Sequence, residues 1–285
     1  MAISRLFSSS LKRLSTSPPR APQPPVFRRT MASRVTINCD MGEGFAKWKL
    51  GPDAELMPLI DLANVACGFH AGDPLTILSS TRLAFASNVA IGAHPGLDDI
   101  RGFGRRKFDV SEEEVYAGAL YQIGAVKAVV EAEGGVLGHV KPHGALYFIL
   151  RDSPALLRAF LKAQLALSPP PPNQPIPFVG LAGTAHESVC KELGIPFIPE
   201  LFVDIDYDAE GRLLSVGESR KPTEEGIREK VERVLREKET LDINNKPLKL
   251  PFLEGGFTIC LHSDMPTALD NVRATRKAVD EFSRQ

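Results

Sequence analysis

The sequence predicts an α/β fold with a single TIM-like βα barrel, and three observations support this prediction. Short apolar or β-branched runs alternate with segments of helical periodicity, which is the pattern of parallel strands joined by helices. Setting aside an atypical first 34 of the 285 residues leaves 251, and a barrel of this kind takes about 250 residues. Almost every expected strand also ends in an ionisable group, as the strands of barrel enzymes do.

Seven strands are expected where β-branched or apolar runs end in Gly, Pro or polar residues. With the polar loops that follow some of them, they span residues 34–40, 62–73, 89–96, 136–144, 178–183, 195–204 and 257–264. Helical periodicity covers residues 75–87. Ser111 and Glu114 form a Ser-x-x-Glu capping box, so a second helix should run to Glu133 and stop at the glycine pair that follows.

Helices are also expected after the later strands, the first of them starting at Asp152 or Ser153. Two segments interrupt the alternation. Residues 168–175, SPPPPNQP, are predicted to form a stiff surface connection, and residues 241–256 are predicted to be a long irregular segment. The alternation resumes unchanged after each, so residues 35–285 are predicted to form one barrel domain.

The first 34 residues differ in composition from the rest of the chain. They contain no Asp or Glu but several Arg, Ser and Pro residues, and apolar residues recur at helical spacing between Ile3 and Leu14. A basic, acid-free amphipathic segment resembles a mitochondrial transit peptide. A disordered tail, or translation that starts at Met31, is the alternative. A mitochondrial or a cytoplasmic location is therefore expected.

Composition excludes several classes of partner. The formal net charge of -1 gives no overall field that would favour nucleic acid or an anionic membrane. No apolar run approaches the roughly 18 residues of a membrane span. Four cysteines lie far apart and form no Cys-x-x-Cys pair, so reduced, buried thiols are expected rather than disulfides or a thiolate zinc site.

The ionisable groups at the strand ends predict a polar active site. The carboxyl ends of parallel barrel strands share one rim, so groups placed there converge. Five of the six histidines fall in such positions. The strand-end groups are Asp40, Glu43, His70, Asp73, His94, His139, Lys141, His143, Glu200, Asp204, His262 and Asp264.

Some of these residues have simpler explanations. Asp73 precedes Pro74 and suits the N-cap of a helix. His139 lies inside its strand, and a structural role is as good an interpretation as a site role. Cys67, although near His70, is expected to be a core thiol. No P-loop or Gly-x-Ser-x-Gly elbow is present, whereas Arg105 in the GFGRRKF segment is a candidate contact for a phosphate or carboxylate.

Several sequence blocks together resemble the LamB/YcsF family. They are INCDMGEGF, ANVACGFHAGDP, AIGAHPG, GFGRR, YQIGA, HVKPHGALY and ICLHSDMPTA, in this order from residue 37 onward. The resemblance implies a TIM-like barrel related to glycoside hydrolases and sugar deacetylases. It also implies a hydrolase, the A-type subunit of an ATP-dependent 5-oxoprolinase, which cleaves 5-oxo-L-proline to L-glutamate together with B- and C-type subunits.

The second half of the chain departs from the family pattern. The family's Ala-Asp-Arg-x-Tyr block is replaced here by FVDIDYDAEG, and its later Arg-containing block is not recognisable in SVGESRKPTEEG. Ser263 stands where the family has Gly in CLHSD. Lost arginines suggest altered recognition of a substrate carboxylate, so a related lactam is as acceptable a substrate as 5-oxoproline.

Opening a stable lactam needs an activated carbonyl carbon, a general base for water and a proton for nitrogen. The hypothesis assigns base and orienting roles to Asp40 and His70, with Lys141 and His143 catalytic on the opposite rim. Substrate contacts are assigned to Glu43, Asp73, His94, Arg105, His262 and Asp264. ATP would act through the partner subunits, because this chain lacks a P-loop.

Two other functions stay open at this point. A metal-dependent amidase or deacetylase would use Asp40 with two of His70, His94 and His143 as ligands of a divalent metal. A non-catalytic lactam-binding subunit is the third interpretation. The sequence does not identify the metal, the lactam or the oligomeric state.

Overall fold

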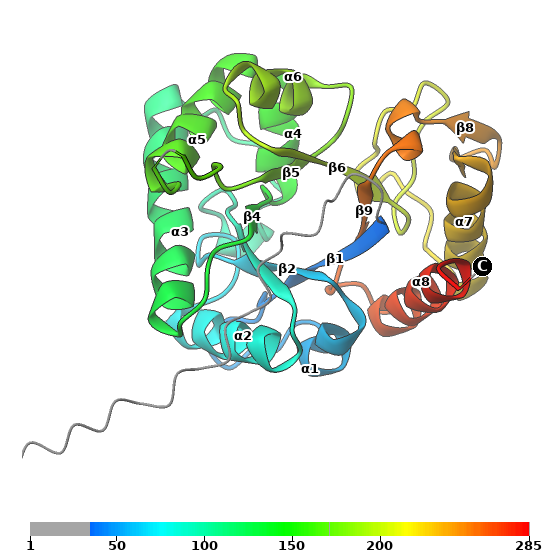
Figure 1. The fold of residues 1–285 in the computed structure, drawn as a ribbon, viewed down its shortest axis with the longest axis horizontal. Helices are drawn as coiled ribbons and strands as arrows, with labels where there is room; N and C mark the ends of the chain where they lie inside the picture. The colour runs from blue at the N-terminus through cyan, green and yellow to red at the C-terminus, as the bar shows by residue number, and fades with distance from the viewer. Residues whose placement is uncertain (1–34, 171, 285) are drawn as a thin grey trace, which may run out of the picture.

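The computed structural model describes residues 35–170 and 172–284, and a closed barrel of parallel strands forms its centre. The expected targeting segment, residues 1–34, lies outside the described residues. Chain order is also the order of the strands round the barrel, and the last strand closes it by pairing with both the sixth and the first. The strands are β1 Val35–Met41, β2 Leu62–Ala66, β3 Ala90–His94, β4 His139–Val140, β5 Phe178–Gly180, β6 Phe197–Phe202 and β9 Phe257–Leu261 (Figure 1). The predicted TIM-like barrel is confirmed, with the seven strands that the sequence pattern indicates.

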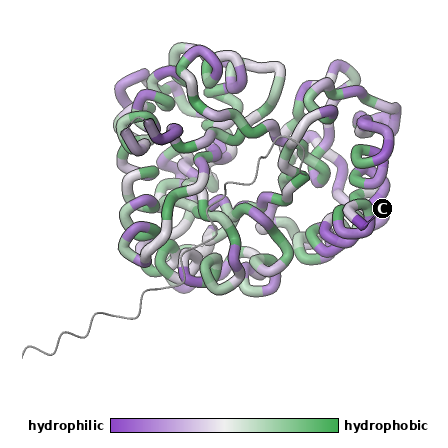
Figure 2. The backbone as a smooth tube through the Cα atoms, in the orientation of Figure 1, coloured by the Kyte–Doolittle hydropathy of each residue, from purple (hydrophilic) through white to green (hydrophobic). Residues whose placement is uncertain are grey.

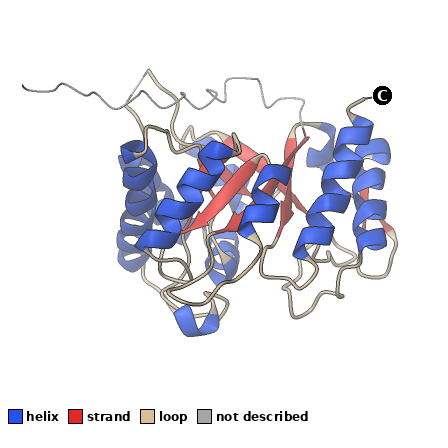
Figure 3. Ribbon diagram, turned by 90° about the horizontal axis from the view of Figure 1, so that it is seen from below, coloured by secondary structure: helices blue, strands red, loops and turns tan. Residues whose placement is uncertain are grey.

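Helices surround the barrel, with the strands in the middle (Figure 3). They are α1 Asp53–Leu56, α2 Pro74–Ala86, α3 Glu112–Ala132, α4 Gly144–Asp152, α5 Pro154–Leu167, α6 Ala185–Glu192, α7 Glu224–Glu237 and α8 Ala268–Phe282, with short 3₁₀ turns η2 Met57–Leu59, η3 Ile100–Gly102 and η4 Pro251–Glu254. The Ser111–Glu114 capping box is present, and Ser153 caps α5. None of the described helices is long and apolar enough to span a membrane.

Of the predictions for the two segments that interrupt the alternation, the structure confirms one and contradicts the other. The described residues of the proline-rich connection between α5 and β5 are largely exposed, as predicted for a surface segment. The prediction of an irregular segment at 241–256 is wrong, because it contributes to the hairpin of β7 Glu239–Leu241 and β8 Pro247–Lys249 and contains η4. Each strand has three residues, and Asp242 accepts the backbone N–H groups of Asn244 and Lys246 in the turn. Strands this short carry no readable alternation of apolar and polar residues.

Hydrophobic residues concentrate along the strands, whereas the outer helices α7 and α8 mix hydrophilic and hydrophobic positions (Figure 2). Inside the barrel, however, a polar chain crosses the core. Asn64 donates to Asn38 at 2.8 Å, and Asn38 donates to Thr258 at 3.1 Å. His139 Nε2 lies 2.7 Å from Asn64 Oδ1. A Cβ at Gly92 would lie 2.2 Å from the His139 ring, so only glycine leaves room for it.

The strand β4 is the shortest of the barrel. It pairs with β3 through two residues and with β5 through one, Val140 opposite Phe178. Backbone bonds on the β3 side continue past the strand, from Lys141 N to Ala93 O and from His143 N to Pro95 O. The segment that leaves β4 is therefore attached mainly to the β3 side before it enters α4.

Candidate functional site

The strand ends converge on one pocket, as the sequence pattern predicts. A cavity of about 280 Å³ opens among the loops at the carboxyl ends of the strands. Its polar lining includes Asp40, His94, Lys141, His143 and His262, which come from four different strands or the loops after them. All five are buried or nearly so, which places ionisable groups in a low-dielectric environment.

Lys141 forms the centre of a buried ionic group inside the barrel. Its Nζ lies 3.0 Å from Asp40 Oδ1 and 3.0 Å from Glu200 Oε1. It also donates to Asn38 at 3.1 Å and to Cys260 Sγ at 2.9 Å. Burial opposes the ammonium charge, but the neighbouring acidic groups outweigh it and hold the pKa of Lys141 above its ordinary value. The lysine is therefore a fixed cation.

Asp40 connects the lysine to the histidines. Its Oδ2 lies 3.3 Å from His94 Nε2 and 3.9 Å from His262 Nε2. Burial favours the protonated acid, but His94 and Lys141 outweigh it and hold the pKa of Asp40 well below its usual value. Asp40 is thus an ionised carboxylate with one oxygen on Lys141 and the other facing the pocket.

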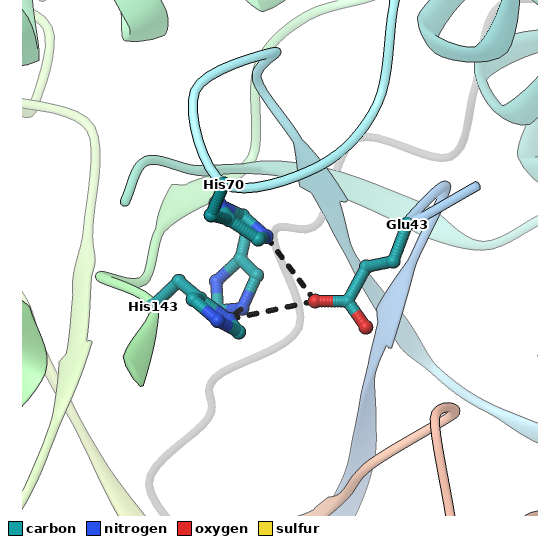
Figure 4. A group of neighbouring side chains, drawn as sticks. Glu43, His70 and His143 are labelled. Carbon is teal, nitrogen blue, oxygen red and sulfur yellow. Dashed lines mark hydrogen bonds and ion pairs between the residues drawn. The ribbon is translucent and has the colours of Figure 1, made fainter. Parts of the chain in front are cut away.

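Three histidines and one carboxylate meet beside Asp40. His70 and His143 stack face to face with ring centroids 3.7 Å apart and planes inclined by 4°. Glu43 Oε1 faces both rings, at 3.2 Å from His70 Nε2 and 3.4 Å from His143 Nδ1 (Figure 4). His94 Nε2 lies 3.0 Å from His143 Nδ1. One ligand atom from each of these four residues lies within 4.8 Å of the others, so the group has the spacing of a metal site.

Glycines allow this histidine cluster to form. Gly104 has a φ of 63°, and a Cβ there would lie 2.7 Å from the Cβ of His70 and 2.9 Å from Cδ2 of His143. A Cβ at Gly96 would lie 2.6 Å from His70 Nδ1. Burial lowers the pKa of both His70 and His143 well below its ordinary value, so the stacked rings are neutral.

The two predicted groups of residues meet in the structure. Lys141 follows β4, which lies across the barrel from β1, and its long side chain crosses the interior to bind Asp40 directly. His143 stacks on His70, because its backbone is bonded to the segment after β3 rather than lying across the pocket. The expected metal carboxylate also changes: Glu43, and not Asp40, completes the group with the histidines.

His262 is held by Asp204 at the other side of the pocket. The Asp204 carboxylate accepts the backbone N–H of His262 at 2.7 Å and lies 3.1 Å from ring Nδ1. Burial lowers the pKa of His262, but Asp204 outweighs burial and raises it to about 9. His262 is therefore an imidazolium at neutral pH, and its Nε2 faces the pocket and Asp40.

Of the remaining residues expected to contact substrate, some lie at the pocket and others do not. Arg105 lines the pocket and pairs with Asp264 at 2.8 Å, so Asp264 positions the guanidinium. Asp73 does not line the pocket: its carboxylate caps α2 through Leu75 and Thr76 and accepts the backbone N–H of Ala46. The capping interpretation of Asp73 is therefore the one that the geometry supports. His139 lies within the polar chain of the barrel interior, away from the pocket lining.

Several residues in or behind the pocket have no role predicted from the sequence. Glu200 and Asp204 are recognisable only as strand-end groups, yet they hold Lys141 and His262 from behind the pocket lining. The alternation of Glu200 with Phe202 along β6 was the available signal, since both then face the same side of the sheet. The apolar wall went unrecognised because most of it lies in an irregular loop; it consists of Phe148, Phe202, Ile205, Leu213 and Val216.

The cysteines behave as the composition indicates. All four are free and buried. Burial raises the pKa of Cys67 above its ordinary value, and its Sγ contacts the backbone oxygen of Val65. Cys67 is thus a core thiol and not a nucleophile.

Comparisons with known proteins agree with this arrangement. The family model of the LamB/YcsF family matches residues 35–285. The lactam utilization protein lamB of Emericella nidulans is 42% identical over 253 residues, covering 88% of this chain and 96% of that protein. An A-type 5-oxoprolinase subunit of Pseudomonas aeruginosa is 40% identical over 252 residues, covering 87% and 98%. The crystal structure of the lactam utilization protein from Thermus thermophilus superposes with a TM-score of 0.79 at 37% identity, covering 88% of this chain and 97% of that one. The chain therefore belongs to the LamB/YcsF family.

Proposed function

We propose that this chain is the lactam-binding and ring-opening subunit of a 5-oxoprolinase-type hydrolase. The carrying observation is the pairing of an ionised carboxylate and a protonated imidazole, Asp40 and His262, on the wall of one small pocket. Lactam hydrolysis needs those two groups, one to take a proton from water and one to give a proton to the ring nitrogen. The names of its relatives, a lactam utilization protein and A-type 5-oxoprolinase subunits, support the same substrate class.

The proposed reaction proceeds in one proton cycle. Asp40 Oδ2 accepts a proton from water while the water oxygen bonds to the lactam carbon. The carbon–nitrogen bond then breaks, and His262 Nε2 gives its proton to the leaving nitrogen. Asp40 afterwards returns its proton to His262, whose Nε2 lies 3.9 Å away. Lys141 keeps Asp40 oriented and ionised throughout, because it also holds the second Asp40 oxygen at 3.0 Å.

The low pKa of Asp40 explains why ATP is needed in this proposal. A carboxylate with a depressed pKa is a weak base, and an unactivated amide carbon resists attack by water. Transfer of the terminal phosphoryl group of ATP to the amide oxygen, with ADP leaving, would make the carbon electrophilic enough for such a base. Cleavage of the carbon–nitrogen bond then leaves an acyl phosphate, which a second water molecule hydrolyses to the carboxylate and inorganic phosphate. We propose that B- and C-type partner subunits supply this activation, since the chain contains no P-loop.

The pocket also suggests how a small anionic lactam would bind. Arg105 and Lys107 are among its lining residues and offer positive charge to a substrate carboxylate. Phe202, Ile205 and Leu213 also line it and offer apolar contact to ring methylenes. A cavity of about 280 Å³ suits a single small ring.

A turnover screen tests the proposal. The purified chain would be assayed with 5-oxo-L-proline and with the unsubstituted five-membered lactam, each with and without ATP and the B- and C-type subunits. Ring opening that requires ATP and the partners supports the proposal. Tight lactam binding without turnover in the complete mixture would overturn it in favour of a non-catalytic role.

The second candidate is a metal-dependent amidase, and the Glu43, His70, His94 and His143 group favours it. In that case the isolated chain would open a lactam or cleave a simple amide without ATP once a divalent metal is added. The same screen separates the two candidates when a metal-supplemented sample without ATP is included.

A further inference from the structure

Two charged groups determine how both amides in the polar chain of the barrel interior are oriented. Lys141 only donates hydrogen bonds, so the Asn38 atom that lies 3.1 Å from its Nζ is the acceptor Oδ1. Asn64 meets Asn38 Oδ1 at 2.8 Å and Asp40 Oδ1 at 2.9 Å, and both acceptors require its amide nitrogen. Each hydrogen of Asn64 Nδ2 then has a partner, and Asn64 Oδ1 is left to accept.

The tautomer of His139 follows from this orientation. Its Nε2 lies 2.7 Å from Asn64 Oδ1, so Nε2 carries the ring hydrogen and donates it. Burial, helped by the positive charge of Lys141, lowers the pKa of His139 to about 3, so the ring is neutral and its Nδ1 carries no hydrogen. Within the described part of the chain, Nδ1 is buried and has no hydrogen-bond partner. Only Nε2 of this histidine is therefore in use.

The fold accepts two unfavourable features to keep a histidine at this position. A buried nitrogen without a partner is destabilising, and a glycine inside a strand weakens the strand. The glycine is Gly92, where a Cβ would lie 2.2 Å from His139 Nε2. An apolar side chain in place of His139 would leave no nitrogen without a partner, but it would not supply the hydrogen that Asn64 Oδ1 accepts. The contribution of the histidine is therefore this single donor.

The Asp40 carboxylate is held asymmetrically by its contacts. Its Oδ1 accepts from Asn64 at 2.9 Å and from Lys141 at 3.0 Å. Its Oδ2 faces His94 Nε2 at 3.3 Å and His262 Nε2 at 3.9 Å. One oxygen is therefore fixed in the barrel interior, and the other is turned toward the pocket.

We propose that Asn64 and His139 are positioning residues for Asp40: His139 holds the amide of Asn64, and this amide holds the carboxylate with Oδ2 toward the pocket. Lys141 alone would not fix the rotation of the carboxylate, because its ammonium is a point charge on a flexible stem. The Asn64 amide is planar and is bonded through both its nitrogen and its oxygen. His139 therefore acts on Asp40 only through Asn64. The importance of this for turnover rests on the proposed function, in which Asp40 Oδ2 takes the proton of water.

Kinetics of ring opening, with ATP and the partner subunits present, test this role. His139→Leu removes the donor and frees the Asn64 amide, so kcat should fall by up to about 100-fold, the scale of a misplacement of about 1 Å in a site. KM should change little, because neither residue lines the pocket. His139→Gln, whose amide N–H can donate to the same oxygen, should restore most of kcat. Asn64→Leu should lower kcat at least as far as His139→Leu does, and combining the two should have no further effect.

Thr258→Val is the matched control. Thr258 accepts from Asn38 at 3.1 Å in the same polar chain, and no hydrogen bond links it to Asp40 among the described residues. The control should lose stability in urea unfolding, as His139→Leu does, but keep its kcat. Circular dichroism shows whether each variant is folded, and Asn64→Leu decides the matter if His139→Leu does not fold. Equal losses of kcat in the control and in His139→Leu would mean that the polar chain only stabilises the barrel.

Crystal structures test the positioning without turnover. In His139→Leu and in Asn64→Leu, Asp40 should be rotated or occupy two conformers, whereas Thr258→Val should leave it as in the wild type. Nitrogen-15 NMR of the wild type should show His139 with its hydrogen on Nε2, identified by the signal that is missing from His139→Gln. An unchanged Asp40 in both variants, or a hydrogen on His139 Nδ1, would overturn the inference. The expected displacement of Asp40 together with absent lactam turnover in the wild type would count against the proposed function alone.

Discussion

Asp204 holds His262 at two points, by accepting its backbone N–H at 2.7 Å and by facing ring Nδ1 at 3.1 Å. This contact fixes the orientation of the imidazole and makes it a cation whose other nitrogen faces the pocket. The two residues belong to different parts of the chain, and they meet because β6 and β9 are neighbours in the barrel. The charge state of the pocket at neutral pH therefore depends on a contact between residues 58 positions apart in the chain.

The pH dependence of the proposed lactam hydrolysis should report this pair. The pKa of His262 is raised to about 9, so turnover that needs its proton should be lost as the pH rises through about 9. Asp204→Asn removes the anion and should move the basic limb of the pH–rate profile toward the ordinary histidine pKa of about 6.5. The measurement is kcat against pH in the complete enzyme.

Asp264→Asn is the control for that experiment, because Asp264 pairs with Arg105 and not with His262. It should raise KM and leave the position of the basic limb unchanged. If the basic limb of the pH–rate profile stays in place in Asp204→Asn, His262 is not the acid of the proposed reaction.

The pH dependence of the free energy of unfolding should also reflect the contact between Asp204 and His262, and the raised pKa of His262 fixes its direction. A histidine whose folded-state pKa is raised stabilises the fold fully below its unfolded pKa, and this contribution is lost as the pH rises through the folded value. The free energy of unfolding should therefore decline between about pH 6.5 and 9 more steeply in the wild type than in His262→Ala. Urea unfolding across this range measures the difference, and parallel curves would contradict it.

Removing the buried lysine should destabilise the fold strongly. Lys141→Met leaves Asp40 and Glu200 without their cation, and breaking a buried ion pair by removing one partner costs about 3–5 kcal/mol. Chemical denaturation followed by circular dichroism measures the loss. Adding Glu200→Gln to Lys141→Met should recover part of it, because one uncompensated charge is then removed.

Lys127→Met provides the matched comparison. Lys127 pairs with Glu131 on the surface of α3 at 2.6 Å, and exposed pairs of this kind contribute less than about 1 kcal/mol. Equal losses of unfolding free energy in Lys127→Met and Lys141→Met would show that the ionic group inside the barrel stabilises the fold no more than a surface ion pair does.

The glycine beside the stacked histidines should matter for turnover and not only for stability. Gly104→Ala would place a Cβ 2.7 Å from His70 and 2.9 Å from His143, so the two rings must shift. Gly194→Ala is the control, because Gly194 has a similar φ of 67° but no atom within 4 Å of the added Cβ. Both variants should lose similar backbone stability, whereas kcat should fall only in Gly104→Ala.

The loop that forms the apolar wall should depend on Asp206. Its carboxylate accepts from Arg220 at 2.9 Å and from Lys230 at 2.8 Å. Burial raises its pKa, but these cations outweigh burial and hold the pKa below its ordinary value. The stabilisation is present above the unfolded value of about 3.9 and is lost as the pH falls below it.

Asp206→Asn should therefore lower the urea midpoint at about pH 7 and have a much smaller effect near about pH 2. It should also raise KM for the lactam, because Ile205 and Leu213 of the same loop line the pocket. An equal stability loss at both pH values would contradict the ionic explanation.

Sequence patterns predicted the strands of the barrel well, because each strand is an apolar run with a polar terminus. Chain order is also barrel order here, so the ionisable residues at the strand ends could be placed on one rim, whereas Arg105 lies in a loop further along. The β7–β8 hairpin was missed because its strands are three residues long and one begins with Pro247.

The site was harder to predict because it depends on how far the side chains extend and on the direction of the backbone in the turns after the strands. Asp40 and Glu43 lie three residues apart, and which carboxylate meets the histidines depends on the turn at Gly42, whose φ is 67°. Strand order places Lys141 opposite Asp40 but does not say that the lysine side chain spans the barrel interior to reach it. The partners of Glu200 and Asp204 likewise required the closure between β6 and β9.

The brevity of β4 has a consequence for where the barrel opens. Lys141 and His143 follow a strand that pairs with β5 through one residue, so the β4–β5 seam has the fewest backbone bonds to break. Local opening follows the weakest hydrogen-bonded units of a fold, and amide hydrogens beside this seam should exchange with solvent before those of β1 and β2. The β5 side of the segment that carries Lys141 and His143 is then the part of the barrel expected to open first.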